Sequence, residues 1–245
     1  MPGGTAEAFL AVPSDHTDGQ THPGVLFFMD AIGLRPQIEQ MAQRIADWGY
    51  VVLAPNVFYR TGTAEEIAPK EDLREPGARD AFFPTIMPHM QALTSDKSNE
   101  DTAAYLAALR ARPEVADGPM GTTGYCMGAR LATRAAGNHP DDIAAVAGFH
   151  GGGLVTEDAD SPHLSLPQAR AEFVYGHADN DQSMGPEAVE ALGTALEAAG
   201  LTAANEVYAG APHGYSMNDT SMYDEAAAER SFTELEALLG RTIRA

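Results

Sequence analysis

The sequence contains a single cysteine, Cys126, so no disulfide can form within the chain and a reducing compartment is favoured. Its first residues lack the basic and apolar segments of a secretion signal. The most apolar run, residues 25–29, is too short to cross a bilayer. We therefore expect a cytoplasmic protein with no membrane partner.

Basic residues are also scarce: 15 Lys and Arg stand against 35 Asp and Glu, which gives a formal net charge of −20. Such a surface repels nucleic-acid phosphates and anionic lipids, so neither is expected as a partner. A chain of 245 residues can bury a full core without disulfides or structural metal. No repeat or linker divides it, and we expect one domain over residues 1–245, as a monomer or a small homo-oligomer.

Short apolar runs alternate with helical patterns along the chain. Helices are predicted from Pro36 to Gly49, from Asn99 to Pro113, over 127–138 and 186–200, and at the C-terminus. This alternation predicts an α/β fold whose mainly parallel sheet has helices on both faces. Residues 56–98 contain four prolines and are predicted to form an irregular excursion over the edge of the sheet where an active site is expected. The predicted strands are residues 24–29, 50–54, 120–125, 144–149, 172–175 and 204–208.

The strongest chemical signal is Gly124-Tyr125-Cys126-Met127-Gly128, between a predicted strand and a predicted helix. A nucleophile at the tip of such a turn needs small neighbours two positions away, so that strand and helix can pack closely. The helix N-terminus favours the thiolate form of the cysteine, and the backbone N–H of Met127 points at a developing oxyanion. The pattern indicates that Cys126 is a nucleophile.

A thiol nucleophile needs a base and a group that orients the base. His213 follows the last predicted strand, and Asp179 follows the strand before it. Both therefore lie at the carboxyl edge of the sheet, as Cys126 does. Asp181, two residues after Asp179, is the alternative acid. The other histidines predicted in loops or at a helix end are His16, His22, His89, His139 and His163.

Two further patterns follow predicted strands. Phe149-His150-Gly151-Gly152-Gly153 is like a glycine-rich oxyanion loop, but it follows the nucleophile in sequence, so we interpret it as a turn near the site. His177 opens a His-Ala-Asp-Asn-Asp run that could hold a metal. No matching ligands stand elsewhere at useful spacing, so no metal or other cofactor is expected. His150 and His177 are predicted to line the pocket.

With these motifs the sequence resembles the dienelactone hydrolase family of the α/β-hydrolase fold along nearly its whole length. The cysteine in the strand-to-helix turn Gly124-Tyr125-Cys126-Met127-Gly128 is the most specific mark of the resemblance. The other matching stretches are Asp30-Ala31-Ile32-Gly33, Gly49-Tyr50-Val51-Val52-Leu53-Ala54-Pro55, Tyr175-Gly176-His177-Ala178-Asp179 and His213-Gly214-Tyr215.

The resemblance implies a role for each matching residue. Cys126 would be the nucleophile, His213 the base and Asp179 the orienting acid. The backbone N–H groups of Ala31 and Met127 would form the oxyanion hole. Family members carry a glutamate just before the Ala31 position that holds the resting thiol, and this chain has the shorter Asp30 there.

The resemblance also implies a substrate site, near which Tyr215 and Met217 are predicted to lie. Family members that open dienelactones grip the substrate carboxylate with an arginine four residues after the histidine, where this chain has Met217. A thioether cannot replace a guanidinium, so we expect no preference for anionic over neutral lactones. Another arginine folded over the pocket would change this expectation, and the candidates are Arg35, Arg60, Arg74 and Arg79.

The sequence therefore predicts a cysteine-dependent hydrolase of small esters or lactones that works through a thioester. A thioesterase or acyl transferase with the same residues is the alternative within catalysis. A binding protein or redox sensor, in which Cys126 is oxidised rather than acylated, is the alternative outside it.

Overall fold

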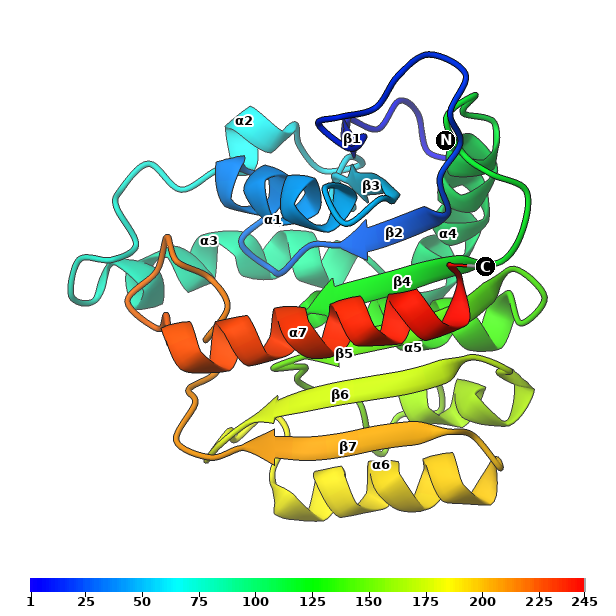
Figure 1. The fold of residues 1–245 in the computed structure, drawn as a ribbon. Coiled ribbons are helices and arrows are strands. Elements are labelled where there is room, and N and C mark those ends of the chain that lie inside the picture. Colours follow the sequence, from blue (N-terminus) through cyan, green and yellow to red (C-terminus); the bar gives the residue numbers. More distant parts are fainter. Residues whose placement is uncertain (245) are drawn as a thin grey trace.

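The computed structural model describes residues 1–244, and its central element is a twisted sheet (Figure 1). In this part of the chain the sheet has seven strands in the order β1-β3-β2-β4-β5-β6-β7. β1 runs antiparallel to β3, and the other neighbouring strands are parallel. The strands are β1 (Ala8–Ala11), β2 (Gly24–Phe28), β3 (Val51–Pro55), β4 (Met120–Tyr125), β5 (Ile143–Phe149), β6 (Glu172–Ala178) and β7 (Ala203–Tyr208).

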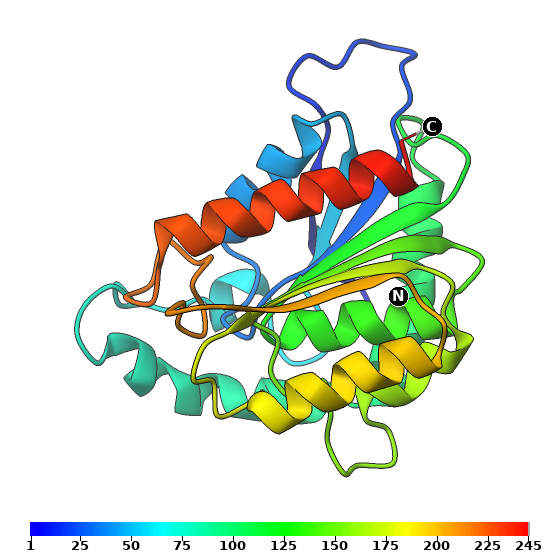
Figure 2. The same ribbon diagram turned by 60° about the horizontal axis from the view of Figure 1, so that its bottom comes forward.

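Helices cover both faces of the sheet, which confirms the predicted α/β class (Figure 2). α1 (Pro36–Ala46) and α7 (Glu225–Thr242) lie on one face. α4 (Ser95–Arg110), α5 (Met127–Asn138) and α6 (Pro186–Ala198) lie on the other, beside a short 3₁₀ helix, η1 (Pro162–Gln168). β2, β3 and β4 are buried along their whole length, because a parallel sheet covered on both sides has no solvent face.

Residues 56–98 are more regular than their prolines predict. They contain α2 (Ala64–Ile67) and α3 (Ala78–Ala92), and α3 includes Pro84 and Pro88. Proline removes one helix hydrogen bond, and that loss is tolerated in a helix with only Ile86 fully buried. α4 also begins earlier than predicted, because the side chain of Thr94 rather than Asn99 caps it.

The order of the strands determines where a site can form. From β2 the chain crosses to β3 on one side, whereas β4 lies on the other side of β2. The crevice outside the carboxyl ends of β2 and β4 is therefore the switch point, where open α/β sheets bind their ligands. Asp30 and Ala31 follow β2 there, and Cys126 follows β4. Within residues 1–244, no helix combines the length and apolar character required to cross a membrane.

Candidate active site

Cys126 occupies a strained turn between β4 and α5. Its backbone has φ 53° and ψ −115°, in the left-handed half of conformational space that side chains other than glycine rarely adopt. The turn is tight: a Cβ on Gly124 would lie 2.1 Å from the carbonyl oxygen of Gly128, and a Cβ on Gly128 would lie 2.2 Å from the carbonyl oxygen of Phe28. The two glycines therefore let α5 start against the ends of both β4 and β2.

His213 reaches the cysteine from the far edge of the sheet. It lies in the segment that follows β7, and this segment folds back across the carboxyl ends of β6 and β5. Its Nε2 is 3.0 Å from the Cys126 sulfur, and its Nδ1 is 2.6 Å from Oδ2 of Asp181. Asp181 Oδ1 accepts hydrogen bonds from the backbone N–H and the hydroxyl of Ser183. The geometry is that of a nucleophile, a base and an orienting acid.

The carboxylate that contacts His213 is Asp181, the alternative acid, and the structure does not place Asp179 at the histidine as predicted. Oδ2 of Asp179 instead accepts a hydrogen bond from the backbone N–H of Gly210, and its own N–H donates to Ala211. Asp179 thus supports the turn that leads to His213. Between the two aspartates Asn180 has φ 54°, and this left-handed residue turns the chain so that Asp181 faces the histidine.

The contacts stabilise the charged forms of all three side chains. Burial alone would raise the pKa of Cys126, but the charge of His213 and its hydrogen bond lower it below that of a free cysteine. Burial would lower the pKa of His213, whereas the sulfur and Asp181 raise it to about 10. Burial likewise opposes ionisation of Asp181, but the His213 contact lowers its pKa to about 2. The thiolate and the imidazolium are therefore the favoured pair.

A narrow pocket of about 20 Å³, here called the inner pocket, opens at the sulfur. The predicted oxyanion residues adjoin it: Ala31 lines the pocket, and the backbone N–H of Met127 hydrogen bonds to Cys126 and helps to lower its pKa. The residues that line it are Asp30, Ala31, Ile32, Arg79, Phe83, Cys126, His150, His213, Gly214, Met217 and Thr220.

Of the other predicted pocket residues, His150 and Met217 line the inner pocket, whereas His177 and Tyr215 do not. His150 is fully buried, and its Nε2 is 2.7 Å from the hydroxyl of Ser216. Its ring meets the ring of His213 edge-on, with 5.4 Å between centroids. His177 on β6 bonds to Asn205 on the neighbouring strand β7, and the Tyr215 hydroxyl donates to the carbonyl of Gly176 on β6.

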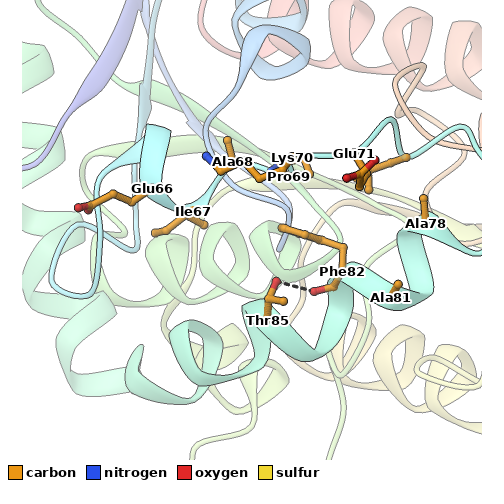
Figure 3. Close-up of a pocket in the computed structure, with 11 residues that line it drawn as sticks. Glu66, Ile67, Ala68, Pro69, Lys70, Glu71, Ala78, Ala81, Phe82 and Thr85 are labelled. Carbon is orange, nitrogen blue, oxygen red and sulfur yellow. Dashed lines mark hydrogen bonds between the residues drawn. The ribbon is translucent and has the colours of Figure 1, made fainter.

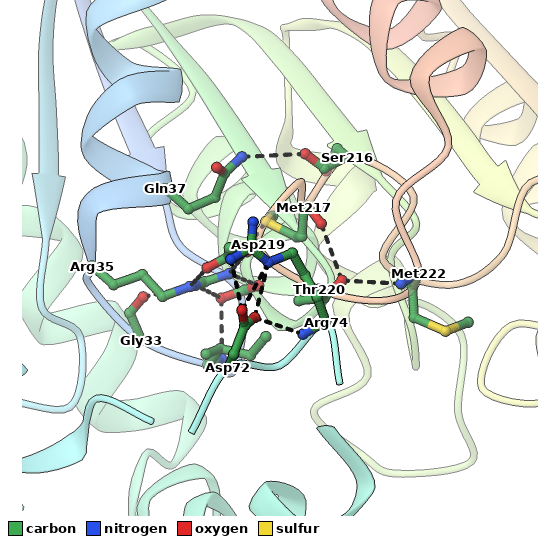
Figure 4. Close-up of polar contacts among 12 residues, drawn as sticks. Gly33, Arg35, Gln37, Asp72, Arg74, Ser216, Met217, Asp219, Thr220 and Met222 are labelled. Carbon is green, nitrogen blue, oxygen red and sulfur yellow. Dashed lines mark hydrogen bonds and ion pairs between the residues drawn. The ribbon is translucent and has the colours of Figure 1, made fainter. Parts of the chain in front are cut away.

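Asp30 is paired with an arginine, and no hydrogen bond joins it to the thiol in residues 1–244. Figure 4 shows this arginine, Arg35, beside Asp219 and Met217. The Arg35 guanidinium donates to both carboxylate oxygens of Asp30 and to both of Asp219. It also lies 3.6 Å from the Met217 sulfur. Arg35 thus joins the turn after β2 to the segment that carries His213. The predicted role of Asp30 in holding the resting thiol is not supported by these contacts.

The other three candidate arginines form different contacts. Arg60 pairs with Asp101, and Arg74 pairs with Asp72, both away from the inner pocket. Arg79 lines the inner pocket, with its guanidinium over the Phe83 ring and 3.7 Å from the exposed Asp80.

Sequence reasoning missed Ile32, Phe83, Gly214 and Thr220 as lining residues. Ile32 and Gly214 adjoin predicted site residues, so proximity in sequence was an available signal for them. Phe83 and Thr220 enter through α3 and the segment after His213, and no motif marks them.

Replacing Asp181 and Asp179 separately tests which of the two carboxylates assists His213. We expect Asp181→Asn to lower kcat for ester hydrolysis at least about tenfold, because an amide cannot stabilise the His213 imidazolium. Asp179→Asn keeps a hydrogen-bond acceptor for Gly210 and should change kcat less than about threefold. Steady-state kinetics of both variants check this. A larger loss in the Asp179 variant would contradict the assignment.

A mainly parallel sheet with a strand–turn–helix elbow at its switch point defines an α/β-hydrolase fold. Residues 6–243 match the model of the dienelactone hydrolase family, and the chain therefore belongs to that family, whose members hydrolyse ester bonds.

Individual relatives agree with this family. A Yersinia pestis protein provisionally named carboxymethylenebutenolidase is 27% identical over 235 residues, covering 93% of this chain and 80% of that protein. The carboxymethylenebutenolidase of Rhodococcus opacus is 25% identical over 236 residues, covering 94% of this chain and 84% of that protein. A Klebsiella pneumoniae structure provisionally identified as a dienelactone hydrolase has a TM-score of 0.79 at 20% identity, covering 97% of this chain and all of that one, which supports the fold.

Proposed function

We propose that the protein hydrolyses small esters or lactones through a covalent thioester on Cys126. The observation that supports this most directly is the contact between Cys126 Sγ and His213 Nε2 at 3.0 Å, with Asp181 on the other ring nitrogen. The favoured thiolate at the start of α5 is the reactive form of a cysteine nucleophile.

In the first half-reaction the thiolate attacks the ester carbonyl and forms a C–S bond. The carbonyl oxygen becomes an oxyanion, which accepts hydrogen bonds from the N–H groups of Ala31 and Met127. Each such donor contributes about 3–4 kcal/mol to the stability of a transition state. As the intermediate collapses, the C–O bond breaks and the alkoxide takes the proton from His213 Nε2.

The second half-reaction returns the enzyme to its starting state. Neutral His213, held by Asp181, takes a proton from water as the hydroxide adds to the thioester carbonyl. The C–S bond then breaks, the acid leaves, and the thiolate–imidazolium pair is restored. A lactone follows the same steps, except that its alkoxide stays attached to the acyl group.

The thioester can be captured. We expect mass spectrometry of enzyme quenched in acid during turnover of an activated ester to show one added acyl group, on the peptide that contains Cys126. Thioesters survive acid quenching, so the adduct should be stable. The Cys126→Ala variant is the matched control, because it removes the only thiol. An adduct on another residue, or hydrolysis without any adduct in a burst experiment, would contradict the mechanism.

Arg79 suggests that a carboxylated substrate is accepted. The expectation of no anionic preference rested on Met217, and it allowed for another arginine at the pocket, which Arg79 supplies. The names of the relatives denote a carboxylated lactone, which agrees with this role. Hydrogen bonds to charged groups contribute about 1.5–3 kcal/mol, so one guanidinium contact corresponds to roughly tenfold or more in kcat/KM.

We expect Arg79→Met to lower kcat/KM for opening of a carboxylated lactone at least about tenfold relative to its methyl ester. Arg74→Met is the matched control, because Arg74 is exposed and paired with Asp72 outside the inner pocket. Equal loss for the acid and the methyl ester in the Arg79 variant would show that this arginine does not recognise the carboxylate.

A further inference from the structure

A second, larger pocket of about 360 Å³ has no role in the proposed mechanism, and Figure 3 shows the residues that line it. We call it the outer pocket. It lies between α2, the segment that follows it, and the first half of α3. Its lining residues are Glu66, Ile67, Ala68, Pro69, Lys70, Glu71, Leu73, Ala78, Ala81, Phe82 and Thr85.

The lining of the outer pocket is suited to an uncharged, apolar ligand. Ile67 and Leu73 are buried, and Phe82 reaches from α3 toward the opposite segment. Two of the charged residues at its edge are already engaged: the Glu66 carboxylate accepts hydrogen bonds from Thr63, and the Lys70 ammonium donates to the Glu65 carbonyl. With Glu71, the charged residues of the lining are two carboxylates and one ammonium, which do not favour an anionic ligand.

The outer pocket shares its walls with the inner pocket on α3. Consecutive residues of that helix face the two spaces: Ala78 and Phe82 line the outer pocket, whereas Arg79 and Phe83 line the inner one.

Two further observations place the segments around the pockets close together. A Cβ on Gly33, two residues after Ala31, would lie 3.5 Å from the Ile67 side chain. The Leu73 carbonyl accepts a hydrogen bond from Ser221, whose neighbour Thr220 lines the inner pocket. The two pockets therefore adjoin each other along α3 and near the Leu73–Ser221 hydrogen bond.

The volumes show why the outer pocket matters for an ester. The inner pocket, at about 20 Å³, is too small to hold a long alkyl chain or an aryl ring beside the reacting carbonyl. An apolar cavity of about 150 Å³ is enough to hold benzene, so the outer pocket, at about 360 Å³, has room for an aryl ring or an alkyl chain of roughly six to eight carbons.

We propose that the outer pocket binds the apolar arm of the ester whose carbonyl lies at Cys126, so that the preferred substrates carry a sizeable uncharged group. This inference rests on the proposed function. Burying four methylenes of the arm in the outer pocket should raise kcat/KM well over tenfold.

The test is a chain-length profile of kcat/KM in two series, p-nitrophenyl esters from acetate to octanoate and acetates of alcohols from ethanol to octanol. In the wild-type protein, kcat/KM should rise at least about tenfold between two and six carbons in one of the two series. Ala81→Trp, which fills the outer pocket, should remove most of that gain. Phe82→Ala, which enlarges it, should move the maximum to longer chains.

Met87→Trp is the matched control, because Met87 is exposed on the same helix and outside both pockets. It should retain the wild-type profile. A flat profile in both wild-type series, or the same profile in the Ala81 and Met87 variants, would overturn the proposal while leaving Cys126-dependent hydrolysis of acetates intact. Undiminished acetate hydrolysis by Cys126→Ala would instead overturn the proposed function, and this inference with it.

Discussion

Replacing Cys126 with alanine is expected to reduce kcat for ester hydrolysis by at least about a hundredfold. In the proposed mechanism the thiolate forms the bond to the substrate carbonyl, and Cys126 is the one residue lining the inner pocket that carries a thiol. Residual rate should come only from the oxyanion donors and from binding. Hydrolysis of p-nitrophenyl acetate by purified variant and wild type measures the loss.

The fold of the variant is expected to be preserved. Alanine keeps the Cβ that the strained turn already accommodates, so the midpoint of urea unfolding should change little. Cys126→Ser is a further control, because a hydroxyl at this position has no comparable tendency to ionise beside His213. It should also lose most activity. A residual rate above about a tenth of wild type in the alanine variant would contradict a nucleophilic role.

Most of the sheet could be predicted from the sequence because its strands are buried on both faces and therefore appear as continuous apolar runs. β1 was missed, since a half-exposed edge strand such as Ala8–Ala11 carries a weaker pattern. α3 was missed for a different reason. Its two prolines argue against a helix, and the structure tolerates them because most of α3 contacts solvent rather than a packed layer.

The cysteine and the histidine of the candidate site could also be predicted, because each follows a strand that leads to the same edge of the sheet. The acid could not be chosen with confidence. Asp179 and Asp181 are two residues apart, and the choice depends on the left-handed backbone of Asn180, which no pattern of side chains reveals.

The environment of Asp30 depends on contacts between segments far apart in the chain. Arg35 and Asp219 are 184 residues apart, and only the folded segment after β7 brings them together. Asp30 and Arg35 are only five residues apart, but sequence spacing could not predict that Arg35 joins Asp30 to Asp219. The same holds for Arg79, whose place at the inner pocket depends on α3 lying across the sheet edge.

His213 is expected to matter more than any other histidine. His213→Ala should lower kcat at least about a hundredfold, because it removes both the proton donor to the leaving alkoxide and the base for water. His177→Gln is the matched control. His177 is closer to Asp181 in sequence than His213 is, but it is bonded to Asn205 and does not line the inner pocket. An inactive His177 variant beside an active His213 variant would contradict this assignment.

The thiol itself provides a second measurement that is independent of turnover. The charge of His213 lowers the pKa of Cys126, so thiolate is present at pH values where a free cysteine is still protonated. The rate of alkylation by iodoacetamide should therefore rise with pH and level off at lower pH in the wild-type protein than for a cysteine in a short peptide.

Two variants test the cause of this shift. In His213→Ala burial still opposes ionisation and the stabilising charge is gone, so the midpoint of the rise in alkylation rate should move to higher pH. In His177→Gln the midpoint should stay at the wild-type value, since that ring does not contact the sulfur. An unchanged midpoint in the His213 variant would mean that the N-terminus of α5, rather than the histidine, stabilises the thiolate.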